Sequence, residues 1–200
     1  MSDLLGADAG AMFSTCGRAR FRLWRSDGPG RRLGWLLMNP SHAGETANDP
    51  TVHAIRRYSR SWGYAGDVVM NLVPFVTSNP IEADRMVAAA ERRDLPSEIA
   101  LGDLMRMNEH HLDIVAHEVD AWVLGWGNPG ERWPAAIRHA LSAITRGDEP
   151  RTICALAVTA SGAPQHPLAR GAHRVPVGAP LRHYDRETRT LGAVWRDAEA

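Results

Sequence analysis

Polar residues able to bind or activate a ligand follow the apolar segments of this sequence. Asn39, Asn71 and Asn128 each follow such a segment, and His166 lies one loop after a fourth. An asparagine amide both donates and accepts hydrogen bonds, and a histidine can also transfer a proton near neutral pH. If these segments are parallel strands, their carboxyl ends meet at one edge of a sheet. The four side chains are then expected to converge there.

The first of these strand ends leads directly into a helix. Residues 36–51 read LLMNPSHAGETANDPT, so an apolar run stops at Asn39-Pro40-Ser41 and Asp49-Pro50 follows a small, polar loop. Asp49 is a favourable N-cap and proline suits the first helical position. Asp49 is therefore predicted chiefly as a helix cap and is kept as a candidate general base. Asn39 before proline could equally serve only to start a turn.

The other polar candidates also have plain structural interpretations. Asn71 could satisfy loose backbone groups at the end of a buried strand. The residues around Asn128 could form a simple turn, and His166 could be one ordinary surface histidine among nine. Because all four residues lie after predicted strands, one shared binding site explains them better than four unrelated structural roles.

Apolar runs alternate with amphipathic segments along the chain, which is typical of an α/β fold. We expect one mostly parallel central sheet flanked by helices. The segments are strands at 19–24, 31–38, 67–70, 121–124 and 152–158, and helices at 50–62, 81–93, 103–119 and between 131 and 147. The first two strands, joined by a turn at 26–30, are predicted to form an N-terminal β-hairpin.

The remaining segments complete the predicted organisation. Residues 1–14 are expected to be flexible, and 15–200 to form a single domain. Residues 95–102 are expected to connect two helices, and a short helix is expected near the C-terminus. The alternation in ARFRLW, residues 19–24, predicts a strand with arginines on an exposed face.

Composition excludes several kinds of chemistry. All 23 basic residues are arginine and the formal net charge is zero, so no P-loop lysine or internal Schiff-base lysine is present. The two cysteines, Cys16 and Cys154, cannot form a four-cysteine metal site, and Cys154 is expected to be a buried small apolar residue. No apolar run approaches the ~20 residues of a membrane span. We expect a cytoplasmic monomer that needs no metal or cofactor.

The same motifs resemble a known family. FRLWR, LLMNPSHAGETANDPT, WGYAGDVVMNLVPFVTSNP, WVLGWGNPG and SGAPQHPLAR together are similar to the bacterial and phage proteins of domain-of-unknown-function family 1643. The resemblance covers about residues 20–170. This chain departs from the family pattern at Asn48, where an acid is usual, and at His42, where a small residue is usual. Residues 171–200 lie outside the pattern.

A more distant resemblance concerns the order of the strand-end motifs, which is similar to that of the uracil-DNA glycosylase superfamily. The resemblance implies a uracil-DNA glycosylase-like fold in which Asn39 orients a water molecule, Asn71 reads a base and His166 stabilises the departing base. It further implies base-pocket roles for Pro40, Ser41, His42 and Asn128, and stacking on a flipped base by Phe75, or by Tyr64 or Trp126. The expected DNA contacts are phosphate binding by Arg56, Arg57, Arg60, Arg170 and Arg174, and a wedge formed by Leu168.

These expectations combine into one functional hypothesis with two alternatives. The leading hypothesis is a monofunctional DNA glycosylase, a hydrolase that removes a uracil-like, mismatched or modified base from duplex DNA by base flipping. Such an enzyme would serve DNA repair or anti-phage defence against hypermodified phage DNA. The alternatives are a non-catalytic nucleic-acid-binding module and a hydrolase or transferase for free nucleosides or nucleotides. The arginines of the helix favour DNA, whereas the zero net charge favours the free nucleotide.

Overall fold

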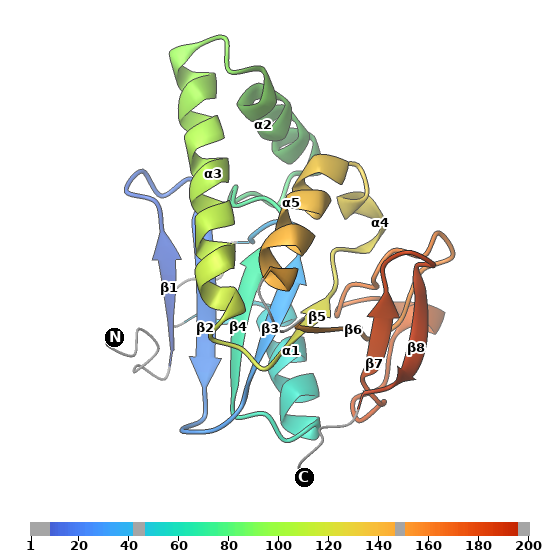
Figure 1. Ribbon diagram of the computed structural model, residues 1–200. Helices are drawn as coiled ribbons and strands as arrows, with labels where there is room; N and C mark the ends of the chain where they lie inside the picture. Colours follow the sequence, from blue (N-terminus) through green and yellow to red (C-terminus); the bar gives the residue numbers. More distant parts are fainter. Residues whose placement is uncertain (1–8, 42–46, 147–150, 196–200) are drawn as a thin grey trace.

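Eight strands form one sheet in the order β1-β2-β4-β3-β5-β6-β7-β8 (Figure 1). The structure is a computed structural model that describes residues 9–41, 47–146 and 151–195. The strands are β1 (Ala9–Phe13), β2 (Arg20–Ser26), β3 (Arg32–Leu37), β4 (Gly66–Asn71), β5 (Ala121–Leu124), β6 (Thr152–Ala155), β7 (Arg182–Asp185) and β8 (Thr190–Val194). The helices are α1 (Pro50–Ser61), α2 (Pro80–Arg92), α3 (Pro96–Ala116), α4 (Gly127–Gly130) and α5 (Pro134–Thr145), with a 3-10 turn, η1, at Gly171–His173.

The sheet is mixed, and the expectation of a mostly parallel sheet is wrong for the sheet as a whole. Parallel pairing links β4 to β3, β3 to β5 and β5 to β6. Antiparallel pairing adds β2 and β1 on one side and β7 and β8 on the other. The α/β class is confirmed, and the four central strands still place their carboxyl ends at one edge.

The predicted hairpin pairs the wrong strands. Strand β4 lies between β2 and β3 and pairs with both, so β2 and β3 are not neighbours. The hairpin at this end of the chain is formed instead by β1 and β2, with Ala9 opposite Arg25. Residues 9–13 are therefore part of the sheet, although they fall within the segment that was expected to be flexible.

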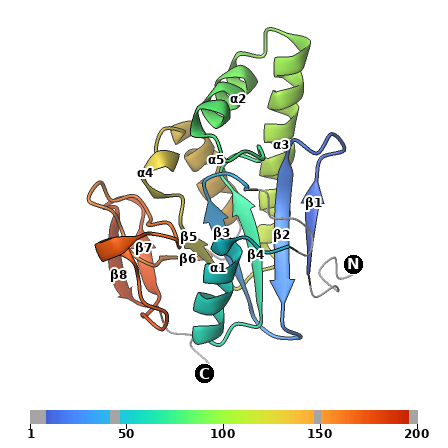
Figure 2. The same ribbon diagram turned by 180° about the vertical axis from the view of Figure 1, so that it is seen from behind.

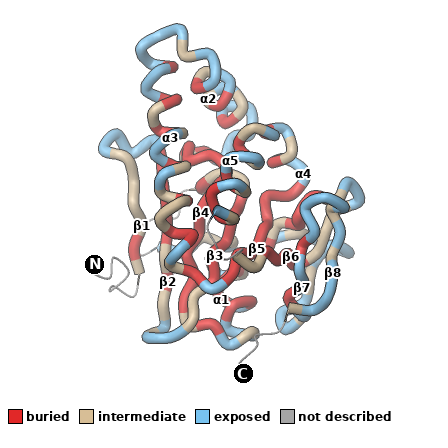
Figure 3. Tube along the Cα trace, in the orientation of Figure 1, coloured by how far each residue is buried: buried red, intermediate tan, exposed pale blue. Residues whose placement is uncertain are grey.

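Helices cover both faces of the sheet. Helices α2, α3 and α5 lie on one face, over a core that includes Phe21, Met70 and Trp122. Helix α1 covers the opposite face, where Trp35, Ile55 and Val69 are buried (Figure 2). Burial on both faces explains why β4 and β5 are buried along their whole length and β3 along all but its first residue (Figure 3).

Local sequence explains where the helices begin. Asp49 caps α1 by accepting a hydrogen bond from the Val52 amide at 2.8 Å, as predicted. Helix α3 begins at Pro96, so the expected connection at 95–102 is wrong. Glu98 accepts the amides of Asp94 and Leu95 at 3.0 and 3.3 Å, and thereby satisfies donors that precede the first turn.

The C-terminal part contains strands where a short helix was expected. Strands β7 and β8 are joined by a turn in which Asp185 Oδ1 accepts the amides of Glu187 and Thr188. Arg189, with φ of 57°, takes the left-handed conformation at the end of that turn. An Asx turn of this kind favours a hairpin over a helix.

The arginines of β2 are buried, contrary to the expectation of an exposed face. Arg20, Arg22 and Arg25 are 3%, 2% and 6% exposed. Arg22 lies over the Trp24 ring and pairs with Glu118 of the segment after α3, whereas Arg25 donates to Asn48 before α1. In the described ranges, no helix is both long and apolar enough to cross a membrane.

Candidate functional site

A cavity of about 300 Å³ opens at the carboxyl ends of β3 and β4. We call it the strand-end pocket. It lies where the chain leaves β3, enters α1 and α2, and passes His166 after β6. The pocket is lined by Arg20, Leu37, Met38, Asn39, Ser41, Asp49, Thr51, Val52, Val69, Asn71, Thr77, Ser78, Pro80, Pro129 and His166. Three of the four predicted strand-end residues, Asn39, Asn71 and His166, therefore share one cavity.

Asn39 holds the loop that forms one wall of this pocket. Its Nδ2 donates to the carbonyl of Thr77 at 2.7 Å and to that of Pro40 at 3.3 Å. Both amide hydrogens are thereby used on the backbone. Oδ1 makes no hydrogen bond within the described part of the chain and can accept one from a water molecule or a ligand.

Asp49 is both a helix cap and a carboxylate of the pocket. One oxygen accepts the Val52 amide, and the other accepts the hydroxyl of Ser41. A carboxylate offers about four acceptor positions, so capacity remains for a further donor. Among the described residues that line the pocket, Asp49 alone carries a carboxylate. The cap prediction is confirmed, and the geometry keeps the general-base role open.

Asn71 and Arg20 form the floor of the pocket. Arg20 Nη2 donates to Asn71 Oδ1 at 3.3 Å, and Asn108 Nδ2 donates to the Asn71 carbonyl at 2.9 Å. Asn71 is 1% exposed, and its Nδ2 has no hydrogen-bond partner among the described residues. Burial lowers the pKa of Arg20 to about 10, while the nearby Asp49 charge opposes this shift. Arg20 therefore remains a cation at neutral pH.

His166 lines the pocket with its ring held in one defined tautomer. Its Nδ1 accepts the amide of Leu168 at 3.1 Å, which places the proton of the neutral ring on Nε2. Burial lowers the pKa of His166, and the negative charge of Asp49 partly offsets this effect. The ring is thus a neutral hydrogen-bond donor at pH 7.

A larger cavity of about 870 Å³ lies next to the strand-end pocket, between α1 and residues 167–177. We call it the arginine groove. It is lined by Pro50, His53, Ala54, Arg57, Tyr58, Pro167, Leu168, Ala169, Arg170, Gly171, Arg174, Val175, Pro176 and Val177. The Tyr58 hydroxyl donates to the Val175 carbonyl at 2.5 Å and holds the two walls together. Pro50 and Pro167 of the groove adjoin Asp49 and His166 of the pocket in sequence.

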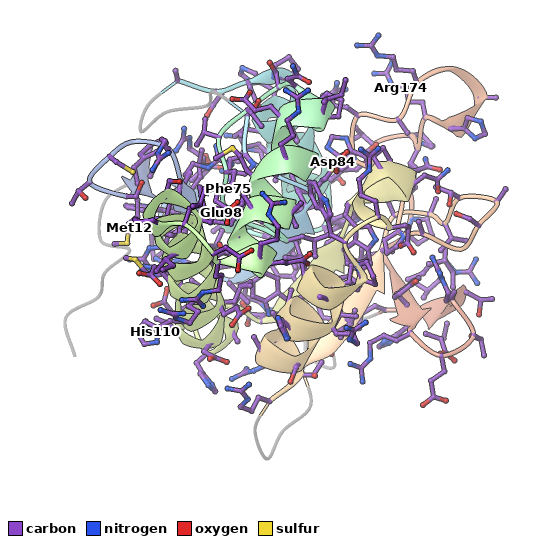
Figure 4. All side chains as sticks on the ribbon, turned by 90° about the horizontal axis from the view of Figure 1, so that it is seen from above. Met12, Phe75, Asp84, Glu98, His110 and Arg174 are labelled. Atoms are coloured by element: carbon purple, nitrogen blue, oxygen red, sulfur yellow. The ribbon has the colours of Figure 1, made fainter. Side chains whose placement is uncertain are left out.

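Four predicted DNA contacts, Arg57, Leu168, Arg170 and Arg174, line this groove. All four are exposed, and Arg174 projects from the outer edge of the molecule in Figure 4. None of the three arginines forms an ion pair with another described residue. Their charges are therefore available to an anionic ligand.

The other two predicted phosphate contacts, Arg56 and Arg60, are already paired. Arg56 is 6% exposed and bridges Asp67, at 2.6 Å, and Asp27. Arg60 donates to both carboxylate oxygens of Asp27 at 2.7 Å. This network corrects the expected basic stripe, because Arg56 pairs with Asp67 of β4 and, of the three arginines, Arg57 alone forms no ion pair with a described residue.

The proposed stacking residues are packed into the protein interior. Phe75 is fully buried and lies among the packed side chains in Figure 4. Trp126 is 3% exposed and donates to Glu131 at 2.7 Å, while Tyr64 stacks on Trp195. None of them lines the strand-end pocket, so their packing argues against contact with a flipped base.

Three further predicted contacts lie elsewhere. Asn128 is exposed, and its Oδ1 accepts the hydroxyls of Thr159 and Ser161 at 2.6 and 2.8 Å, which turns the side chain away from the pocket. Pro40 is buried behind the wall without lining the cavity. His42 lies outside the described residues. Ser41 does line the pocket, as expected.

The most important residue that sequence reasoning missed is Arg20. Its alternation with apolar residues indicated an exposed face, and only the pairing of β2 with β4 brings it beside Asn71. Thr77, which lines the pocket and whose carbonyl accepts from Asn39, was also missed. In the described segments, no three histidine, cysteine, aspartate or glutamate side chains gather as metal ligands.

Comparison with known protein families decides the classification. Residues 20–168 match the model of a family described as "Protein of unknown function (DUF1643)". The chain belongs to the DUF1643 family. The match ends at Leu168, so it includes every strand-end motif and half of the residues that line the DUF1643 protein's arginine groove. Comparisons with curated proteins and with solved structures find no match, and the likeness to uracil-DNA glycosylases stays a prediction.

Proposed function

We propose that this DUF1643 protein is a DNA glycosylase that hydrolyses the bond between a base and its deoxyribose. One observation carries the proposal: Asn39, Asp49, Asn71 and His166 line a single cavity at the strand ends. A cavity of about 300 Å³ is at the lower end of small-molecule sites, which supports a pocket for one extruded base.

The residues of the pocket supply each part of the reaction. Asn39 Oδ1 can orient a water molecule by accepting a hydrogen bond from it, and the Asp49 carboxylate can take its proton. The water oxygen bonds to the sugar C1′ as the C1′–N bond breaks, and the electron pair of that bond passes to the base. Asp49 takes the water proton, and the base receives a proton on release. The products are a free base and an abasic site.

His166 can stabilise the charge that develops on the base. A neutral ring donating from Nε2 stabilises a developing anion without being an acid itself. This arrangement suits a base that departs as an anion.

The arginine groove supports binding of a nucleic-acid strand. Arg57, Arg170 and Arg174 line it and form no ion pair with another described residue, and Tyr58, Pro176 and Val177 give it apolar surface. Phosphates on the arginines would fix the strand while one nucleotide enters the neighbouring pocket. The exposed Leu168 lies between His166 and Arg170 in sequence, at a position suited to replace the extruded base in the stack.

A free nucleoside or nucleotide is the second candidate substrate. The observation that favours it is the modest charge of the groove, which three arginines line on a chain of zero formal net charge. Such a substrate would place its phosphate in the groove and its base in the pocket. This alternative predicts that mononucleotides compete for the binding site and that the protein does not bind duplex DNA.

The test of the proposed function is the formation of abasic sites. The protein is incubated with duplex DNA containing uracil, mismatched bases or hypermodified bases of phage DNA, and abasic sites are titrated with an aldehyde-reactive probe. We expect signal on at least one DNA and its loss in Asp49→Asn and His166→Ala. Arg106→Ala on α3, far in sequence from both cavities, is the matched control. Absence of abasic sites across the panel would count against the function.

A further inference from the structure

The strand-end pocket has a floor that consists of hydrogen-bond donors. Arg20 is 3% exposed and lines the pocket. All five N–H groups of a guanidinium donate and none can accept. Hydrogen bonds from a charged guanidinium are stronger when the acceptor carries negative charge.

Asn71 adds a further hydrogen-bond donor to this floor. Because Arg20 can only donate, the Asn71 atom that faces it must be the oxygen, and this fixes Nδ2 at the other end of the amide. Nδ2 is buried in the wall of the pocket without a partner among the described residues. A buried donor without a partner costs about 1–3 kcal/mol unless a ligand or water satisfies it. The floor therefore favours a ligand that brings acceptor atoms and negative charge.

We propose that Arg20 is a catalytic residue which binds an oxo group of the base and stabilises the negative charge of that base as the glycosidic bond breaks. This inference rests on the proposed function. The electron pair of the C1′–N bond delocalises onto the oxo group, where Arg20 and Asn71 Nδ2 donate to it. The substrate class is then bases with a ring carbonyl facing the floor. A base that presents an exocyclic amino group there would meet donors only, as adenine does.

Arg22 supplies a matched control for Arg20. It lies two residues along the same strand, on the other side of the register shift between β1 and β2. It is 2% exposed and pairs with Glu118, but it does not line the pocket. Arg20→Met and Arg22→Met each remove one buried cation from β2. Only Arg20→Met removes a cation that lines the pocket.

The test uses a free base whose ionisation is visible. 5-Nitrouracil changes its ultraviolet spectrum when it loses a proton, so the bound form can be identified without any reaction. We expect the wild-type protein and Arg22→Met to bind the anion, and Arg20→Met to bind it about 100-fold more weakly. Binding of the neutral form, equal binding by Arg20→Met, or no binding by the wild type would each overturn the inference. The wild-type spectrum decides the question even if a variant fails to fold.

A second measurement separates catalysis from positioning. Cleavage is compared on DNAs whose target bases differ in acidity, in the wild type and in Arg20→Lys. A catalytic Arg20 predicts a loss that grows as the base becomes a poorer leaving group, whereas a merely structural role predicts a uniform loss. If the protein binds the anion but cleaves no DNA, the proposed function is wrong, whereas anion binding by Arg20 and Asn71 is retained. Cleavage that does not depend on Arg20 would overturn the role proposed for Arg20 and leave the proposed function intact.

Discussion

The amide of Leu168 donates to Nδ1 of His166 at 3.1 Å. This bond links the backbone of one predicted DNA contact to the side chain of one predicted catalytic residue. It requires an unprotonated Nδ1, because a protonated ring can only donate. The charge state of His166 therefore determines whether the loop toward Arg170 keeps its geometry.

The first prediction concerns the titration of His166. Burial lowers its pKa below the usual 6.5, and the charge of Asp49 works against this shift. NMR titration of the imidazole is expected to give a pKa below 6.5 in the wild type and a still lower one in Asp49→Asn. Activity should fall as the pH drops through that value, because protonation breaks the Leu168 bond. A higher pKa in Asp49→Asn would show that Asp49 does not act on the ring.

The second prediction concerns Asn39→Asp. A carboxylate cannot donate to the carbonyls of Thr77 and Pro40, which both accept from Asn39 Nδ2. We expect a loss of about 1–3 kcal/mol in the free energy of unfolding, measured by urea denaturation, and no gain in activity from the added carboxylate. Asn39→Ser, which removes the amide without adding charge, serves as the control. A faster enzyme of unchanged stability would contradict the holding role of Asn39.

The third prediction concerns stability in acid. Hydrogen bonds from Arg60, and then from Arg56, lower the pKa of Asp27 from 3.8 to about 2. The stability that this carboxylate contributes is complete above pH 4 and is lost as the pH falls toward 2. The side chain is 43% exposed, so solvent screening limits the contribution to less than ~1 kcal/mol. Denaturation of Asp27→Asn should show a deficit at pH 6 that disappears near pH 2.

The fourth prediction concerns the salt dependence of DNA binding. Each phosphate contact adds about one to the slope of log K against log salt concentration. Arg57→Ala and Arg174→Ala should each reduce this slope by about one, whereas Arg60→Ala, whose side chain is engaged by Asp27, should change it little. Equal slopes in all four proteins would place the DNA elsewhere.

Much of the architecture was predictable because its signals are local. Asp49-Pro50 specifies the start of α1, and the apolar run at 67–70 predicts a buried strand of the central sheet. Cys154 is fully buried, as its apolar neighbours indicated. Because parallel strands share a carboxyl edge, the convergence of Asn39, Asn71 and His166 followed from their positions after strands.

The rest depends on pairing between distant segments. Whether the arginines of β2 face solvent is decided by α3 and β4, neither of which is near in sequence. Arg20 and Asn71 are 51 residues apart, so no local pattern announces their contact. Arg56 and Arg57 are adjacent, yet the partner Asp67 on β4 buries one and leaves the other exposed. The turn of Asn128 toward Thr159 likewise arises only in the folded chain.

The most direct test of the central claim is the identity of the released product. Duplex DNA carrying a cleavable base is incubated with the protein, and the low-molecular-mass fraction is analysed by mass spectrometry. We expect a free base in amounts equal to the abasic sites formed. Both products should still form with Arg22→Met, and neither should form with Asp49→Asn. Release of a nucleoside or nucleotide, or of nothing from any DNA, would contradict it.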